Sequence, residues 1–331
     1  MASVVFLGTP DFAAGILQGL VDAGYEVSAV FTQPDRPKGR KGLLQMPPVK
    51  ELALKLGIPV FQPVKIREEE NVRILQELHP DFIACAAFGQ IIPQSILDIP
   101  PYGCLNVHAS LLPAWRGAAP IQWSILSGDR TTGVTIMRMN AGLDTGDMIL
   151  KKEVEIGPDE TGDSLFDVLM ADGAGLLVQA MEQILEGRAV YTPQPEESPT
   201  PYAKMLKRQS GLIDWSQSAA QIERMIRAFD SWPGTYTYLN GKTLKILKAR
   251  PVPAHEAEQM KQKALSLSGC GQAAAGEILC AGKEGLVVQT GDGALRLLEV
   301  QLEGKKRMDA ASFLRGCHLQ AGGMLTGDKS L

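Results

Sequence analysis

Short apolar runs alternate with segments of helical spacing through the first half of the chain. Val4 to Gly8 is continuously apolar, as in a strand buried on both faces, and Asp11 to Ala23 has apolar residues at helical intervals. The predicted elements that follow are Glu26 to Phe31, Val49 to Leu56, Pro59 to Gln62, Glu68 to Leu78, Phe82 to Phe88, Cys104 to His108, Ala118 to Leu126, Gly133 to Met139, Met148 to Ile156 and Ser164 to Leu185. This alternation predicts an α/β fold with a Rossmann-like, doubly wound and mainly parallel sheet.

The pattern changes after this helix. Residues 190–206 contain four prolines and little apolar content, which predicts a semi-rigid linker. Beyond it lie a predicted helix, Ser218 to Phe229, and five short predicted strands: Gly234 to Leu239, Thr243 to Ala249, Gly276 to Cys280, Gly285 to Thr290 and Ala294 to Leu302. Five short strands predict a small β-barrel resembling the oligonucleotide-binding (OB) fold. The expected organisation is therefore a catalytic domain at 1–189, the linker at 190–206 and the barrel domain at 207–331.

One hydrophilic stretch rich in Gly and Ala, from His255 to Ala275, falls between two of the predicted barrel strands. We expect it to be a flexible loop. Its presence leaves the strand register of the second domain open.

Charge is distributed unevenly between the two halves. Residues 1–200 contain 15 Lys and Arg against 25 Asp and Glu, a net charge of −10, whereas residues 201–331 contain 18 against 12, a net charge of +6; together they give the −4 of the whole chain. A basic domain favours a polyanionic partner such as nucleic acid, and a solvated basic surface is the alternative.

Cysteine usage and hydropathy exclude other classes. The five cysteines are an odd number without a C-x-x-C pair, which argues against a disulfide framework and a zinc knuckle. We expect no metal, a reducing cytoplasmic location and, for lack of an exposed heptad pattern, a monomer. The N-terminus has no basic leader, and the longest apolar runs are interrupted well before the roughly 18 residues of a membrane span, so we expect neither a signal peptide nor a membrane segment.

The turn after the first predicted strand argues against a dinucleotide cofactor. Such a turn carries three spaced glycines so that the backbone can approach a pyrophosphate. Here the sequence is Gly8-Thr9-Pro10-Asp11-Phe12, with a single glycine. An NAD-dependent oxidoreductase therefore loses most of its support, since fold alone does not determine function.

The predicted strand Cys104 to His108 turns from apolar to polar at its C-terminal end, the end at which α/β sheets bind ligands. Asn106 and His108 lie two residues apart, so their side chains share one face of the strand. An amide can stabilise an oxyanion and an imidazole can move a proton, and acyl transfer to an amine needs both. The alternative is that His108 is a hydrogen-bonded histidine with a structural role.

A turn-rich segment, Asn140 to Asp147, follows the next predicted strand. It could be only a turn. If it projects over the sheet end, Asp144 can orient His108 and hold a water for proton relay, with Asp147 as the less favoured partner. Since no Ser or Cys nucleophile is paired with this histidine, we predict direct transfer without a covalent enzyme intermediate.

The segment Pro34 to Gly42 is too rich in Pro and Gly to be a helix, and we expect an exposed, mobile loop. It carries four cations: Arg36, Lys38, Arg40 and Lys41. They suit phosphate contact, and a solvated basic loop is the alternative interpretation.

These residues together resemble one family, the methionyl-tRNA formyltransferases within the wider group of 10-formyltetrahydrofolate-dependent formyltransferases. The resemblance covers nearly the whole chain. It rests on Phe6-Leu7-Gly8-Thr9-Pro10-Asp11-Phe12, the loop Pro34 to Arg40, Asn106-Val107-His108-Ala109-Ser110-Leu111-Leu112-Pro113 with Arg116-Gly117, and Gly142-Leu143-Asp144-Thr145-Gly146.

The resemblance implies that the chain formylates the amino group of initiator methionyl-tRNA with 10-formyltetrahydrofolate, a one-carbon transfer in translation initiation. It implies a catalytic trio of Asn106, His108 and Asp144. It further implies a folate site formed by Ser110, Leu111, Leu112, Pro113, Phe88, Gly89, Gln90 and Ile91. The basic loop would read the acceptor end of the tRNA, chiefly through Arg40 with Arg36, Lys38 and Lys41, and the basic barrel domain would face the tRNA.

Two other classes of function remain as alternatives. The first keeps the chemistry and changes the acceptor to a sugar nucleotide, a ribonucleotide amine or water. The second is a tRNA-binding or folate-binding module without catalysis. The two basic segments argue against the first, and the intact trio argues against the second.

Overall fold

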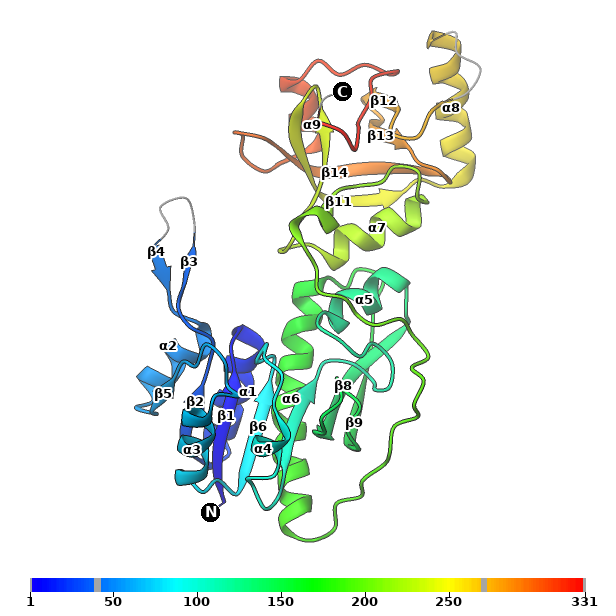
Figure 1. Cartoon of the computed structure of the whole chain (residues 1–331). Coiled ribbons are helices and arrows are strands. Elements are labelled where there is room, and N and C mark those ends of the chain that lie inside the picture. The colour runs from blue at the N-terminus through cyan, green and yellow to red at the C-terminus, as the bar shows by residue number, and fades with distance from the viewer. Residues whose placement is uncertain (1, 39–42, 269–272, 330–331) are drawn as a thin grey trace. The chain divides into compact units, whose positions relative to one another are not determined.

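The computed structural model describes residues 2–38, 43–268 and 273–329 of the 331-residue chain (Figure 1). The chain divides into two compact units. The first comprises Met1–Ile121, Arg130–Ile156 and Ser164–Met205, and the second comprises Gln122–Asp129, Gly157–Asp163 and Leu206–Leu331. The two short segments that group with the second unit lie inside the range 1–189 that the sequence assigns to one domain.

The first unit contains a seven-stranded sheet in the order β5-β2-β1-β6-β7-β8-β9. The first five strands of this order are parallel to one another, and at one edge β8 pairs antiparallel with both β7 and β9. The strands are β1 (Ser3–Gly8), β2 (Glu26–Phe31), β5 (Val60–Phe61), β6 (Phe82–Ala86), β7 (Cys104–His108), β8 (Thr131–Arg138) and β9 (Met148–Glu155). The predicted mainly parallel α/β sheet is thus confirmed.

The strand order reverses between β1 and β6. The chain builds outward from β1 to β2 and β5, and then returns to place β6 on the other side of β1. In doubly wound sheets, ligands bind beside this reversal, at the carboxyl ends of the strands. The turns that follow β1, β6 and β7 therefore mark the edge at which a site is expected.

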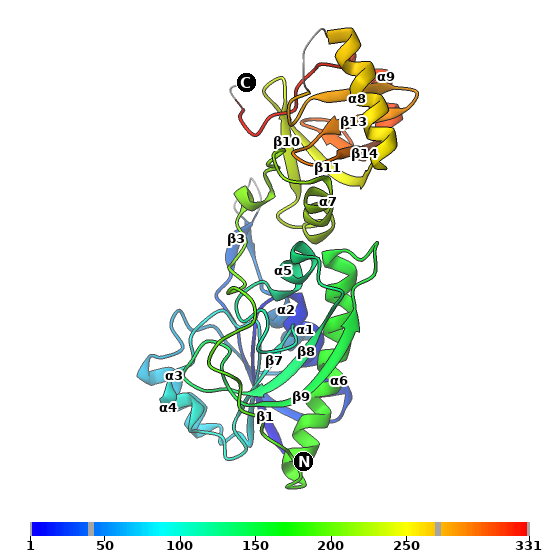
Figure 2. The same cartoon turned by 90° about the vertical axis from the view of Figure 1, so that its right-hand side faces the viewer.

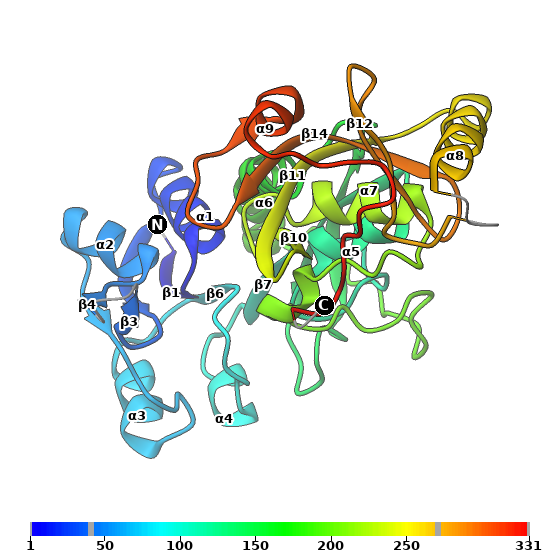
Figure 3. The ribbon, with the colours of Figure 1, turned by 90° about the horizontal axis from the view of Figure 1, so that it is seen from above.

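Helices cover both faces of this sheet. They are α1 (Asp11–Asp22), α2 (Pro48–Lys55), α3 (Glu69–Glu77), α4 (Gln94–Leu97) and α6 (Gly162–Leu185), whereas most of α5 (Pro120–Ser127) groups with the second unit. Figure 3 shows α3 and α4 on the side of the sheet opposite α1. Because both faces are covered, the side chains of the central strands β6 and β7 are buried throughout.

Helix α6 is a core helix of the first unit. It lies beside β8 and β9 (Figure 2), and Gly173 lets it approach the sheet, since a Cβ there would lie 2.8 Å from Val107 Cγ1. Within the described residues, α6 is also the one helix long and apolar enough to cross a membrane by length and composition. The sequence-based expectation overlooked this. Its buried apolar side chains are Leu165, Leu169, Leu176, Leu177, Ala180, Met181 and Ile184.

Residues 190–203, which we call the strap, follow α6 as an extended segment of the first unit. Thr192 and Met148 exchange two backbone hydrogen bonds of 2.8 and 2.9 Å. Near the other end, the Ala203 amide donates to the Arg116 carbonyl at 2.8 Å. The strap, which lies in the range expected to be a linker, is thus held against the first unit at both ends.

The second unit contains an antiparallel sheet in the order β10-β11-β14-β13-β12, with β15 paired to β14. Its strands are β10 (Thr235–Leu239), β11 (Lys242–Pro251), β12 (Ile278–Gly282), β13 (Gly285–Gln289), β14 (Ala294–Leu302) and β15 (Met308–Asp309). Helices α7 (Ala219–Ala228) and α9 (Ala310–Gly316) supply Ile222 and Phe313 to its buried core. Five of these strands correspond to predicted ones, whereas β15 and α9 were missed.

The insertion from His255 to Ala275 is not the predicted flexible loop over most of its length. Residues Ala254–Ser268 form helix α8. The run Glu256-Ala257-Glu258-Gln259-Met260-Lys261 consists of strong helix formers, and Met260 is buried with Val252 and Leu279. Helix propensity together with one apolar anchor therefore outweighs the hydrophilic composition on which the prediction was based.

Candidate active site at the end of strand β7

Asn106 and His108 lie on β7 at the centre of the sheet. β7 pairs in parallel with β6 and antiparallel with β8, so its backbone is fixed on both sides. The two side chains are 8% and 6% exposed, respectively. Their separation of two residues places them on the same face of the strand, as the sequence predicts.

His108 and Asp144 come together as the sequence predicts. His108 Nδ1 lies 3.7 Å from Asp144 Oδ1, within ion-pair range. Asp144 has a φ of +55°, a left-handed conformation that few residues other than Gly adopt, and Asp is among those that tolerate it. The tight turn between β8 and β9 thereby directs the carboxylate back toward the end of β7.

The far side of this pair is held by residues 115–117. His108 Nε2 lies 3.0 Å from the Trp115 carbonyl, and the Gly117 amide donates to Asp144 Oδ2 at 3.0 Å. Because a carbonyl accepts only, Nε2 carries a proton, and Nδ1 is the ring nitrogen that faces the carboxylate. The imidazole is thus oriented at both nitrogens.

The turn Ser110 to Pro113 follows β7 and is fixed by hydrogen bonds. Thr135 Oγ1 donates to the Ser110 carbonyl at 2.7 Å and accepts from the Leu112 amide at 3.0 Å. The side chains of Ser110 and Leu112 are fully buried, whereas Leu111 and Pro113 are half-buried. A ligand at this turn would therefore meet its backbone and the two half-buried residues.

The loop Phe88 to Ile91 follows β6 at the point where the strand order reverses. The Phe88 carbonyl accepts from Thr9 Oγ1 at 3.1 Å and from Gln33 Nε2 at 3.2 Å, so residues after β1, β2 and β6 meet here. Gly89 has a φ of +81°, and the side chain of Ile91 is 71% exposed.

The amide of Gln90 is occupied within the protein. Its Oε1 accepts from the Ile66 amide at 2.7 Å, and its Nε2 donates to the Pro63 carbonyl at 3.0 Å. Gln90 therefore secures this loop to residues 63–66.

Two buried thiols lie near the site. Burial raises the pKa of Cys85, on β6, to about 12 and also raises the pKa of Cys104, on β7. A thiolate is the nucleophilic form, so neither cysteine is available as a nucleophile at neutral pH. This agrees with the expectation of direct transfer.

Comparison with known proteins gives the family. Residues 1–181 match the description "Formyl transferase" and residues 205–318 match "Formyl transferase, C-terminal domain". The chain belongs to the formyl transferase family. This confirms the resemblance seen in the motifs.

Two relatives that are similar over nearly the whole length are named methionyl-tRNA formyltransferase. The chain is 53% identical over 323 residues to the methionyl-tRNA formyltransferase of Agathobacter rectalis, covering 98% of this chain and 99% of that protein. It is 48% identical over 320 residues to the methionyl-tRNA formyltransferase of Geobacter metallireducens, covering 97% of each.

Solved structures share the fold at low identity. HypX from Aquifex aeolicus, solved in complex with tetrahydrofolic acid, is 20% identical with a TM-score of 0.59, covering 95% of this chain and 47% of that one. The sugar 3N-formyl transferase WlaRD is 18% identical with a TM-score of 0.63, covering 92% and 99%, respectively. The fold of this formyl transferase is therefore shared by proteins of low sequence identity.

The basic loop of this formyl transferase is largely a hairpin. Arg36–Lys38 forms β3, which pairs antiparallel with β4, Leu43–Gln45. A loop was predicted, because the Pro and Gly content of the sequence concealed the two short strands. Arg36 lies in β3 and is exposed, Lys38 ends β3, and Arg40 and Lys41 lie outside the described residues.

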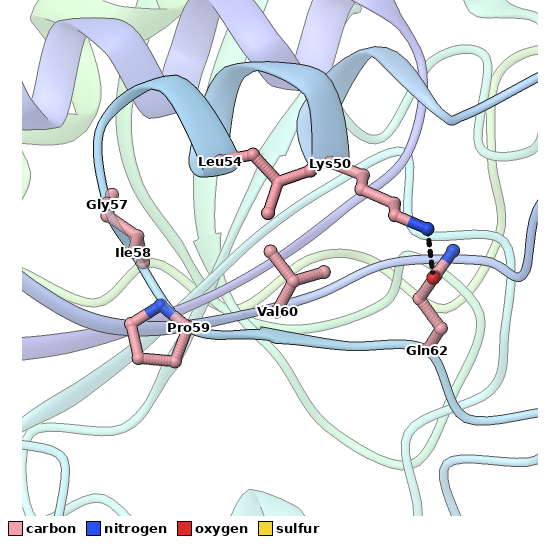
Figure 4. Close-up of a pocket in the computed structure, with 7 residues that line it drawn as sticks. All are labelled: Lys50, Leu54, Gly57, Ile58, Pro59, Val60 and Gln62. Atoms are coloured by element: carbon pink, nitrogen blue, oxygen red, sulfur yellow. Dashed lines mark hydrogen bonds between the residues drawn. The ribbon is translucent and has the colours of Figure 1, made fainter.

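A three-residue cluster, which we call the latch, fixes the base of this hairpin. Lys50 Nζ donates to Asp35 at 2.8 and 2.9 Å and to Gln62 Oε1 at 2.7 Å, and Gln62 Nε2 donates to Asp35 Oδ1 at 2.7 Å. Hydrogen bonds from Lys50 and Gln62 lower the pKa of Asp35. A hollow of about 530 Å³ beside the latch is lined by Lys50, Leu54, Gly57, Ile58, Pro59, Val60 and Gln62. Figure 4 shows Lys50 and Gln62 meeting there.

Across the described part of the chain, no three His, Cys, Asp or Glu side chains come together in a way that could hold a metal ion. The adjacent Cys317 and His318 follow α9 in the second unit.

Sequence reasoning missed two residues around the site. Arg116 is 9% exposed, and its guanidinium donates to Gln194, Pro195 and Glu196 of the strap. Gln194, on the strap, contacts the loop that carries Asp144. The motif Arg116-Gly117 was a sequence signal for Arg116, whereas nothing in the proline-rich segment marked Gln194.

Proposed function

We propose that the protein transfers the formyl group of 10-formyltetrahydrofolate to the amino group of methionine on initiator methionyl-tRNA. The observation that carries this proposal is the similarity, along nearly the whole of both chains, to proteins named methionyl-tRNA formyltransferase. Such a reaction belongs to translation initiation and to the cytoplasm. We further propose that the enzyme acts as a monomer, away from membranes and without a metal.

In the proposed mechanism, Asn106, His108 and Asp144 act on the formyl carbon. The Asn106 amide donates to the formyl oxygen as negative charge develops on it. The His108 ring, held by Trp115 and Asp144, accepts the proton that leaves the methionyl amine as the new C–N bond forms. When the bond to the folate nitrogen breaks, the same proton is delivered to that nitrogen, so the enzyme ends unchanged. The pairing of His108 with Asp144 at 3.7 Å supports this assignment.

We assign the folate to the two turns at the same edge of the sheet, Phe88 to Ile91 and Ser110 to Pro113. In this assignment the pterin ring lies at Phe88 to Ile91, where backbone groups pair with its polar edge. Leu111 and Pro113 contribute apolar contact at the other turn. Support comes from the position of both turns at strand ends, one of them beside the reversal of strand order.

We assign the tRNA to the hairpin and to the second domain. Arg40, with Arg36, Lys38 and Lys41, would contact the acceptor end. The second domain, residues 207–331 after a catalytic domain at 1–189 and a connecting segment at 190–206, would bind tRNA through its basic surface. An OB-like barrel is supported by two isolated bridges from the C-terminal segment to opposite edges of the sheet. One joins Thr326 to Tyr238 on β10, and the other joins Met324 to Glu277, which precedes β12.

The test supplies labelled 10-formyltetrahydrofolate together with one of four acceptors: methionyl-tRNA, free methionine, an amino-sugar nucleotide or water alone. We expect label on methionyl-tRNA and negligible transfer to the other three. If the folate is consumed and no label appears on tRNA, the assignment of the catalytic trio stands and the assignment of methionyl-tRNA as the acceptor is wrong. Binding of both substrates without single-turnover transfer would overturn catalysis altogether.

A further inference from the structure

The strap reaches the catalytic pair through one side chain. The carboxamide of Gln194 donates from Nε2 to the Asp144 carbonyl at 3.0 Å and to the Gly146 carbonyl at 2.7 Å. The first carbonyl belongs to Asp144 itself, which holds a left-handed conformation, and the second lies two residues later in the same turn. One amide nitrogen therefore fixes the backbone that directs the Asp144 carboxylate.

The other end of the same amide is held by a buried cation. Gln194 Oε1 accepts from Arg116 Nε at 3.0 Å and from Nη2 at 2.9 Å. Arg116 donates further to the Glu196 carbonyl at 3.0 Å and to the Pro195 carbonyl at 2.7 Å. Since the guanidinium donates only, these contacts fix the orientation of the Gln194 amide, with its nitrogen toward the Asp144 turn.

The neighbours of Arg116 hold the same pair. The Trp115 carbonyl accepts from His108 Nε2, and the Gly117 amide donates to Asp144 Oδ2. The strap in turn holds Trp115, whose amide donates to Thr200 Oγ1 at 2.6 Å. Residues 115–117 and the strap thus form one hydrogen-bonded frame around His108 and Asp144.

We propose that Gln194 is a positioning residue for the transfer reaction: it links the Asp144 turn to Arg116 and so sets the carboxylate relative to His108. This inference rests on the proposed function, because the role of the pair is assigned there. The hydrogen bonds of the Gln194 side chain to Arg116 and to the turn that carries Asp144 reach neither the folate turns nor the hairpin, so its effect should fall on the chemical step. Displacing a catalytic group by about 1 Å can cost about 100-fold in rate.

Three variants of the full-length protein separate the parts of this contact. Gln194→Met removes both sets of hydrogen bonds at similar length. Gln194→Glu keeps an acceptor for Arg116 and replaces the donor with an oxygen that faces two carbonyls. Glu197→Gln, an exposed neighbour on the strap, is the matched control.

The measurement is kcat and KM for formyl transfer to methionyl-tRNA, with wild type assayed first. We expect Gln194→Met and Gln194→Glu each to lower kcat about 30-fold, with both KM values within about twofold and Glu197→Gln unchanged. A loss confined to Gln194→Met would mean that anchoring by Arg116 is what matters and would overturn the role of the two donor bonds. Rises in KM without loss of kcat would overturn it too.

A double-mutant cycle excludes a general loss of structure. In an Asp144→Asn background, Gln194→Met should cost less than about threefold in the single-turnover rate, because its effect passes through the carboxylate already removed. Additive losses in the two variants would overturn the proposal. Should wild type itself transfer no formyl group to methionyl-tRNA, the proposed function fails, and that result is distinct from any outcome of the cycle.

Discussion

Two buried threonines on β8 have opposite surroundings. Thr135 is fully buried and bridges the Ser110 carbonyl and the Leu112 amide. Thr132 is 2% exposed, and its hydroxyl has no hydrogen-bond partner within the described ranges. The same substitution to Val should therefore have opposite effects at positions three residues apart.

Thr135→Val should lower the free energy of unfolding by about 1–3 kcal/mol, because a buried amide and a buried carbonyl each lose a partner. If the turn Ser110 to Pro113 binds folate, KM for 10-formyltetrahydrofolate should also rise by about tenfold, equivalent to 1.4 kcal/mol. Urea unfolding and steady-state kinetics measure the two effects. Thr132→Val is the control and should leave stability unchanged or raise it. Equal losses in both variants would mean that the hydrogen bonds of Thr135 have no special role.

At the scale of single residues, the sequence predicts those features that depend on local geometry. Strand periodicity is enough to put Asn106 and His108 on one face, and the Asx-rich turn directs attention to Asp144. The carbonyl partner of His108 could not be predicted, because it depends on how the chain turns back after β7. The contacts of the Gln194 amide could not be predicted either, because they depend on how the strap lies against the turn that carries Asp144. A proline-rich segment has the same composition whether it hangs free or is held by hydrogen bonds.

Elements were predicted best where burial dictates their pattern. Cys104–His108 and Ala294–Leu302 were predicted with the bounds that β7 and β14 have. The misses include α8 and the β3–β4 hairpin, where hydrophilic or Gly-rich composition obscured regular structure. In both cases the deciding contacts are few, namely one buried methionine and three residue pairs between short arms.

The latch beneath the hairpin gives a prediction at the scale of elements. Asp35→Asn removes the charge to which Lys50 donates, so the hairpin base should loosen, and KM for methionyl-tRNA should rise by about three- to tenfold. KM for the folate should not change. Because hydrogen bonds lower the pKa of Asp35, the latch should persist at neutral pH and be lost only as the pH falls into the acid range.

The control for this prediction is Glu51→Gln, which removes an exposed carboxylate from the same helix, α2, next to Lys50. If both variants raise KM for tRNA equally, the effect comes from overall charge. The latch would then have no specific part in tRNA binding.

The whole molecule combines an acidic first part with a basic second part. The net charges of −10 and +6 for residues 1–200 and 201–331 mean that any polyanion should be bound by the hairpin and the second domain rather than by the acidic remainder. Such binding releases counterions and weakens as salt rises.

Raising salt from 50 to 200 mM should therefore raise KM for methionyl-tRNA roughly 40-fold if three phosphates are neutralised. The folate, held by turns within the first unit, should be affected far less. Parallel measurements of both KM values across this range give the comparison. Equal, shallow dependence for both substrates would favour a small acceptor over tRNA.

The most direct test of the account is the single-turnover rate of formyl transfer to methionyl-tRNA, with enzyme in excess, for wild type and for Asn106→Ala. Removing one oxyanion donor should slow transfer by about two to three orders of magnitude while tRNA binding stays unchanged. Asn71→Ala, on α3, is the matched control and should transfer at the wild-type rate. A rate for Asn106→Ala close to that of wild type would contradict the assignment of the reaction to the end of β7.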